Sequence, residues 1–141
     1  MEAAMTELPA TPSAASDEWF SAVREGLAGR TLAPYLGPGA SLPGEVPAGY
    51  DQLAAALGEK VSLPKRAQGN PWASAQYIES KKHRNTLVRW LAEAFAAPLE
   101  PSPLQRHLAS LGLPLIVDTW YDGAMRAALS ARSDWAELQG I

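Results

Sequence analysis

The chain has 141 residues, a formal net charge of −3 and hydrophobic residues at 47% of its positions. This length is enough for one domain with a hydrophobic core. The acidic balance argues against general nucleic-acid binding, which needs a basic surface. The absence of cysteine excludes disulfides and thiolate zinc sites. No apolar stretch approaches the roughly 20 residues that cross a bilayer, and the acidic start is unlike a secretory signal. A cytoplasmic protein without a membrane partner is expected.

A leader and a first helix are predicted from the opening residues. Residues 1–15 are rich in Ala, Pro, Ser and Thr, a composition typical of disordered segments, so the domain is expected over 16–141. Ser16 is a candidate N-cap, because acidic residues follow it and suit the positive end of a helix dipole. Gly29 is expected to end this helix. Four apolar residues recur at helical spacing and predict a buried stripe: Trp19, Phe20, Val23 and Leu27.

The next segments predict a strand, a turn and a group of helices. Thr31–Leu36 is an apolar run that stops at Gly37-Pro38-Gly39, which favours a strand that ends in a turn. Gly58 is expected to cap the first of the following helices. The helices are predicted over 50–57, 71–83 and 85–96.

A second strand is expected near the end of the chain. Ser102 and Pro103 suit the N-cap and the first position of another helix, which Gly112 ends. Leu113–Asp118 is again a short apolar run, and helical spacing resumes from Tyr121. The order of strand, several helices, strand and helix predicts an α/β fold. Its two strands are expected to be parallel, because a long helical crossover separates them.

The glycine turn is the first candidate binding segment. Closely spaced glycines after a strand tolerate positive φ and let a phosphate approach backbone amides. Gly37-Pro38-Gly39-Ala40-Ser41 lacks the third glycine of the dinucleotide fingerprint and the Gly-Lys-Ser/Thr of the P-loop. Taken alone, it is explained equally well as a plain turn. Asp118-Thr-Trp-Tyr-Asp122 supplies the context, because it follows the carboxyl end of the second strand, where α/β sheets bind ligands.

With these segments in this order, the chain resembles the sirtuin-like family over roughly residues 30–130. The glycine turn matches the family's Gly-Ala-Gly-x-Ser, His107–Leu111 matches its His-x-x-Leu-Ala-x-Leu helix, and Asp118–Asp122 with Met125–Leu129 matches its Thr-Thr-Asn-Tyr-Asp strand end and next helix. The resemblance implies a partial Rossmann-like, three-layer α/β domain that binds NAD or an ADP-ribose-like nucleotide, with no metal. The residues it implies for this cofactor are Gly37, Gly39, Ala40, Ser41, Thr119, Trp120 and Asp122.

The family's reactive positions are altered in this chain. Trp120 stands where the family has its Asn, and Asp118 where it has the first Thr. An indole donates one hydrogen bond and accepts none, so it cannot order the attacking water as the Asn would. We therefore expect NAD-cleaving chemistry to be altered or lost. Two alternatives stay open. One is an active NAD hydrolase or deacylase that uses Asp118 as its catalytic residue. The other is a non-catalytic accessory protein, similar to sirtuin-like proteins of bacterial nitrogen-fixation gene clusters.

The remaining candidates are interpreted mainly as structural. His107 is expected to make a structural hydrogen bond, and His83 to lie at a solvated helix end, so a zinc site is not expected. Asp122 suits the N-cap of the next helix. The sheet has fewer strands than the family's, which implies a longer product, or a protein partner or second copy that completes it. Trp19, Trp72 and Trp90 are predicted in the core, and Trp120 as a lid or stacking platform. Six basic residues are interpreted as a solvated helical face: Lys65, Arg66, Lys81, Lys82, Arg84 and Arg89.

Overall fold

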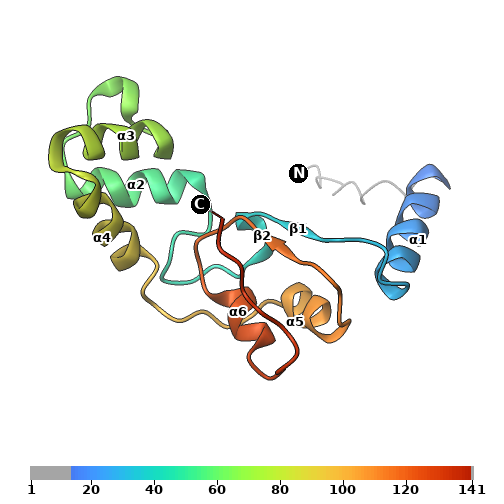
Figure 1. The fold of residues 1–141 in the computed structure, drawn as a ribbon. Coiled ribbons are helices and arrows are strands. Elements are labelled where there is room, and N and C mark those ends of the chain that lie inside the picture. Colours follow the sequence, from blue (N-terminus) through green and yellow to red (C-terminus); the bar gives the residue numbers. More distant parts are fainter. Residues whose placement is uncertain (1–13, 141) are drawn as a thin grey trace, which may run out of the picture.

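The structure is a computed structural model that describes residues 14–140, with side chains described from residue 16 (Figure 1). The predicted leader lies largely outside the described residues, and the first helix begins two residues before the expected N-cap Ser16. The helices are α1 (Ala14–Ala28), α2 (Tyr50–Lys60), α3 (Pro71–Lys82), α4 (Arg84–Ala94), α5 (Pro103–Ser110) and α6 (Ala124–Leu129). The strands are β1 (Tyr35–Leu36) and β2 (Val117–Asp118), and two single 3₁₀ turns are η1 (Pro38–Ala40) and η2 (Lys65–Ala67).

The two strands form the predicted parallel pair. Tyr35 lies opposite Val117 and Leu36 opposite Asp118. Helices α2 to α5 lie between the strands in the chain, so the predicted long helical crossover is confirmed. The pairing covers two residues of each six-residue apolar run, because Pro34 has no N–H to donate and such residues do not continue a ladder. The described chain is thus a mainly helical α/β protein with a short parallel pair.

Helices α5 and α6 cover one face of this pair. Leu36 is buried in a cluster with Leu108 and Ala109 of α5 and Met125 of α6. Tyr35 points to the other face and is 75% exposed. Since that face has no cover among the described residues near Tyr35, the three-layer arrangement stays a prediction.

Helices α2, α3 and α4 form a second packed group, seen beside the strand pair in Figure 1. Leu57 of α2 and Ile78 of α3 are at most 1% exposed in its core. Gly58 lies inside α2, which continues to Lys60, so its predicted role as a helix cap is wrong. A β-carbon at Gly58 would lie 3.6 Å from Leu63, which is an ordinary contact. The glycine is therefore not required by packing.

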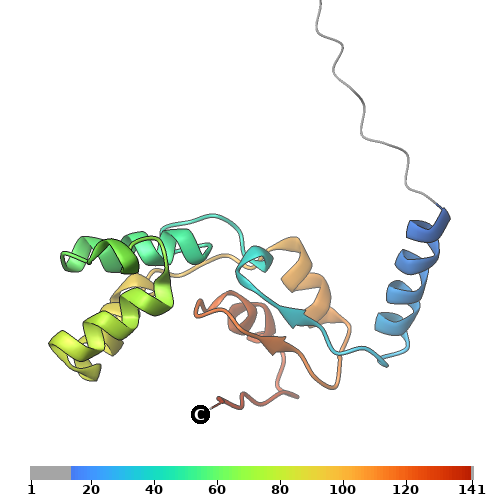
Figure 2. The same ribbon diagram turned by 90° about the horizontal axis from the view of Figure 1, so that it is seen from above.

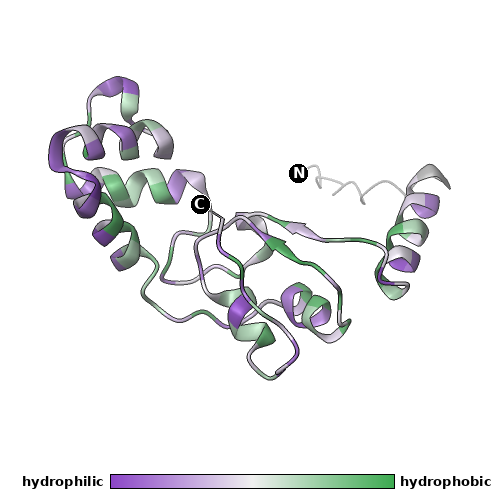
Figure 3. Ribbon diagram, viewed as in Figure 1, coloured by the Kyte–Doolittle hydropathy of each residue, from purple (hydrophilic) through white to green (hydrophobic). Residues whose placement is uncertain are grey.

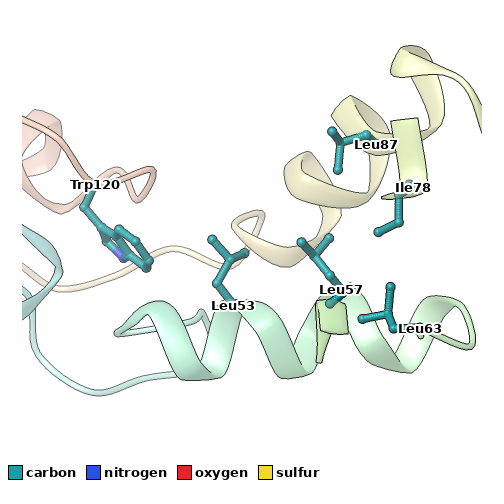
Figure 4. Packing of buried hydrophobic residues seen from close by; sticks show 7 residues of the cluster. Leu53, Leu57, Leu63, Ile78, Leu87 and Trp120 are labelled. Atoms are coloured by element: carbon teal, nitrogen blue, oxygen red, sulfur yellow. The ribbon is translucent and has the colours of Figure 1, made fainter. Parts of the chain in front are cut away.

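Three of the four tryptophans whose burial was predicted lie in the opposite environment. Trp19 and Trp72, expected in the core, are 61% and 62% exposed. Trp90 packs half-buried against the core, as predicted. Trp120, expected at the surface, is 6% exposed and belongs to the buried cluster of the helical group. Figure 4 shows its ring reaching from the loop after β2 toward Leu53 of α2. Trp120 thus joins the strand pair to the helical group.

Helix α1 stands apart from both groups. Figures 1 and 2 show it at one end of the molecule, joined to β1 by a single extended segment. Phe20 is 60% exposed, so the prediction of a fully buried stripe is wrong at Trp19 and Phe20. Only Leu27, near the end of the helix, packs against the cluster around the strands. No helix among the described residues is both long enough and apolar enough to cross a membrane.

Candidate functional site

The carboxyl ends of β1 and β2 lie side by side, because Leu36 pairs with Asp118. The glycine turn Gly37–Ser41 follows β1, and Thr119–Asp122 follows β2. The structure therefore brings together the two segments that were predicted as parts of one site, although Leu36 and Thr119, which stand directly before and within them, are 83 residues apart in the chain. This edge of a parallel sheet is where α/β proteins commonly bind ligands.

The glycine turn is a tight 3₁₀ turn. The Ala40 amide donates to the Gly37 carbonyl at 3.1 Å, and the Ser41 amide to the Pro38 carbonyl at 3.5 Å. Neither Gly37 nor Gly39 has a positive φ, so the turn does not use the tolerance of glycine for left-handed backbone. A β-carbon built on either glycine would meet no atom within 4 Å. The space next to both glycines is therefore open. The packing of the protein itself does not require glycine at either position.

Helix α5 holds the turn through its first residues. The Ser102 hydroxyl donates to the Ala40 carbonyl at 2.7 Å, and Gln105 Nε2 donates to the Ser41 hydroxyl oxygen at 3.0 Å. Ser102 caps α5 as predicted, in a reciprocal capping box with Gln105. Gln105 is only 1% exposed. The predicted ligand residue Ser41 therefore also has a structural partner that the sequence reading missed.

Thr119 and Trp120 fasten the other side of the site. The Thr119 amide and hydroxyl both donate to the Leu36 carbonyl, at 3.0 and 2.8 Å. Trp120 Nε1 donates to the Pro47 carbonyl at 2.9 Å. The indole also lies edge-on to Tyr50 and Phe95, with ring centroids 5.3 and 5.7 Å away. In this structure Trp120 is an anchor inside the fold, not the exposed stacking platform that was predicted.

Two carboxylates flank Trp120. Asp118 Oδ1 accepts the Trp120 amide at 3.0 Å. Partial burial raises the pKa of Asp118; that hydrogen bond opposes the shift, and the charge of Asp122 adds to it. Asp122 Oδ1 accepts the Ala124 amide at 2.9 Å and so stabilises the start of α6, although the N-cap is Gly123 and not Asp122 as predicted. Asp122 Oδ2 is buried and has no hydrogen-bond partner within the described chain. Asp122 Oδ2 can therefore still accept a hydrogen bond beside the end of β2.

A pocket of about 510 Å³ lies next to these carboxylates. Asp118, Tyr121 and Asp122 line one side, and the C-terminal segment 135–140 lines the other. Arg126 and Glu137 hold this segment in place, with a shortest contact of 2.6 Å. Residues of the glycine turn are not part of the lining. The two predicted halves of the site are thus adjacent through the backbone but do not share one enclosed pocket.

Replacing Asp118 with Asn should change stability in a pH-dependent way. Folding raises the pKa of Asp118, so its contribution to folding is most favourable below the unfolded pKa and is lost as pH rises through the folded pKa. Asn keeps the oxygen that accepts the Trp120 amide but carries no charge. Asp118→Asn is therefore expected to be modestly more stable than wild type at neutral pH, and the advantage should disappear in acid. Urea unfolding at several pH values measures this. An advantage independent of pH would contradict it.

The histidines and basic residues lie at the surface. His83 joins α3 to α4 and is exposed, as predicted. His107 is exposed on α5, and the structural hydrogen bond expected of its ring is not found among the described residues. The predicted solvated face is confirmed, since all six of its basic residues are exposed. Within residues 14–140 no group of three His, Asp or Glu side chains is placed to hold a metal ion.

Fold and site together define a small, mainly helical α/β protein whose parallel strand pair carries a glycine turn and a carboxylate-bearing segment at adjacent ends. Comparison of the chain with protein-family models, with curated proteins and with solved structures gives no match. The resemblance to the sirtuin-like family therefore depends on the residues quoted above and on nothing further.

Proposed function

We propose that this chain is a divergent sirtuin-like, Rossmann-like domain that binds NAD or a related ADP-ribose-like nucleotide, with NAD-cleaving chemistry altered or lost. One observation carries the proposal. The register that sets Leu36 beside Asp118 puts the glycine turn and the segment Thr119–Asp122 at one sheet edge. The open space above Gly37 and Gly39 supports it, because a bulky ligand can approach the backbone closely only where side chains are absent.

The structural role of Trp120 supports the proposed loss of NAD cleavage. Its only polar atom donates to the Pro47 carbonyl, and an indole has no acceptor with which to order an attacking water. Asp118 is the remaining candidate base, and its raised pKa is compatible with that role. We expect NAD cleavage at background level in wild type and in Asp118→Asn alike. A sharp fall on this substitution would instead favour an active hydrolase or deacylase.

A second candidate is a non-catalytic accessory protein with an empty site. It is favoured by the internal hydrogen bonds of Ser41, Thr119 and Trp120, each of which has a partner without any ligand. Under this alternative the site holds the fold together and a protein partner is bound elsewhere. If the folded protein binds neither NAD nor ADP-ribose, the accessory-protein alternative is favoured.

Calorimetric titration with NAD and ADP-ribose tests the proposed binding. Gly39→Ala is the informative variant, because the added methyl group meets nothing within 4 Å in the free protein yet occupies the space a ligand would use. We expect an unchanged fold and at least about tenfold weaker binding, a loss of about 1.4 kcal/mol. The matched control is Gly58→Ala in α2, which should bind normally and be about 0.5–1 kcal/mol more stable. Equal binding by wild type and Gly39→Ala would contradict the proposed position.

A further inference from the structure

The apolar side of helix α1 lines an open groove at the end of the molecule away from the candidate site. Phe20, Val23 and Leu27 form one wall, and His107 with Leu111 forms the other. The groove has a volume of about 690 Å³. In Figure 3 the ribbon of α1 carries both hydrophilic and hydrophobic bands. Among the described residues, this apolar side is therefore not fully covered, since Phe20 is 60% exposed.

Helix α1 has little packing to stabilise it among the described residues, where Leu27 contacts the cluster around the strands. It has 15 residues, and isolated helices of about this length are marginal in water, because most helical stability in proteins comes from packing. The Phe20 ring is 60% exposed, and the Trp19 ring, 5.0 Å away and edge-on to it, is 61% exposed. Two large aromatic side chains beside an unfilled groove mark a surface for association.

The charges of α1 indicate which partner fits. Asp17 and Arg24 are seven residues apart, about two helical turns, so both flank the apolar stripe on the same side. Glu18 and Glu25 fall on the opposite side of the helix by the same spacing. When two identical helices cross antiparallel about a two-fold axis level with the midpoint between residues 17 and 24, residue 17 of each copy meets residue 24 of the other. Both contacts join opposite charges, so the surface is complementary to itself.

We propose that two copies of this chain associate through antiparallel α1 helices. Phe20 and Val23 of one copy pack against Val23 and Phe20 of the other, and the Asp17–Arg24 contacts close one flank. Each helix thereby fills the groove that the other leaves open. The proposal does not depend on nucleotide binding, since none of the groove residues belongs to the candidate site.

Sedimentation velocity over a range of protein concentrations tests the pairing. Wild type should show reversible association from 15.0 kDa to twice that mass. Asp17→Arg or Arg24→Asp alone places like charges opposite each other twice in each dimer, and each should weaken association about tenfold or more. The double variant Asp17→Arg with Arg24→Asp exchanges the charges and should restore it. Glu18→Arg changes the net charge by the same amount as Asp17→Arg but lies on the other side, so it should have little effect.

Three results would overturn the proposal. One is a wild type that stays monomeric at every concentration. Another is a dimer that tolerates both single charge reversals, because its interface would then lie elsewhere. The third is a double variant no stronger than the singles, because restored pairing is what distinguishes this contact from general damage to the helix. Restoration cannot come from a misfolded helix, so the double variant also controls for folding.

Discussion

Replacing Trp120 with Ala is expected to destabilise the protein by about 3–5 kcal/mol, the usual cost of removing a buried aromatic side chain. Trp120 is 6% exposed. It is the side chain of the β2 end that reaches the cluster of α2, α3 and α4 (Figure 4). Its loss leaves a cavity between Tyr50 and Phe95 and also leaves the Pro47 carbonyl without its donor. Since small domains are stable by only about 5–15 kcal/mol, this is a large fraction of the total stability.

Urea unfolding monitored by circular dichroism measures this cost. Trp120→Phe is the matched variant, because it keeps a ring but removes the hydrogen bond to Pro47. It should lose less than the alanine variant, about 1–3 kcal/mol. Trp72→Ala supplies the control for loss of a tryptophan at the surface, since Trp72 is 62% exposed, and it should cost less than Trp120→Ala. An alanine variant at position 120 within about 1 kcal/mol of wild type would contradict the anchoring role.

Replacing Gln105 with Ala is expected to cost about 2–4 kcal/mol, because the buried Ser102 amide and the half-buried Ser41 hydroxyl both lose their partner. Gln105 is 1% exposed; its oxygen accepts the Ser102 amide at 2.8 Å and its nitrogen donates to the Ser41 hydroxyl at 3.0 Å. The neighbouring Arg106→Ala is the control, since its contact with Glu100 is exposed and 3.9 Å long. Thermal or urea unfolding should separate the two variants clearly. Similar small effects from both would show that Gln105 does not hold the glycine turn.

The strand pair and its neighbours could be predicted from the sequence because the relevant signals are local. Two apolar runs separated by helical segments predict parallel strands, and their carboxyl ends must then meet. The Ser102-x-x-Gln105 pattern before a helix is also a local capping signal, although only Ser102 was identified from it. The hydrogen bond from Gln105 to Ser41 was beyond reach, since it spans 64 residues. The structural role of Ser41 could therefore not be predicted, because no sequence pattern links Ser41 to Gln105.

The errors at Trp19 and Trp120 both concern whether distant elements cover a side chain. Helical spacing shows which residues share a side of a helix, but not whether another element covers that side. Trp19 and Phe20 share a side of α1 that stays largely uncovered, whereas Trp120 is buried by Tyr50 of α2 and Phe95, at the C-terminal end of α4. These contacts join segments distant in sequence. The stripe on α1 was detected correctly as a pattern, and its burial is what the proposed second copy would supply.

The central proposal is nucleotide binding at the carboxyl ends of β1 and β2, and a ¹⁵N–¹H NMR titration with ADP-ribose tests it most directly. We expect saturable shifts in the amide signals of Gly37, Gly39, Ser41, Thr119 and Asp122, and Gly39→Ala should need at least about ten times more ADP-ribose for the same degree of saturation. The signals of α2, α3 and α4 away from the loop contacts should stay in place. A well-dispersed spectrum that does not change on addition of ADP-ribose, or that changes only in the helical group, would contradict the proposed site.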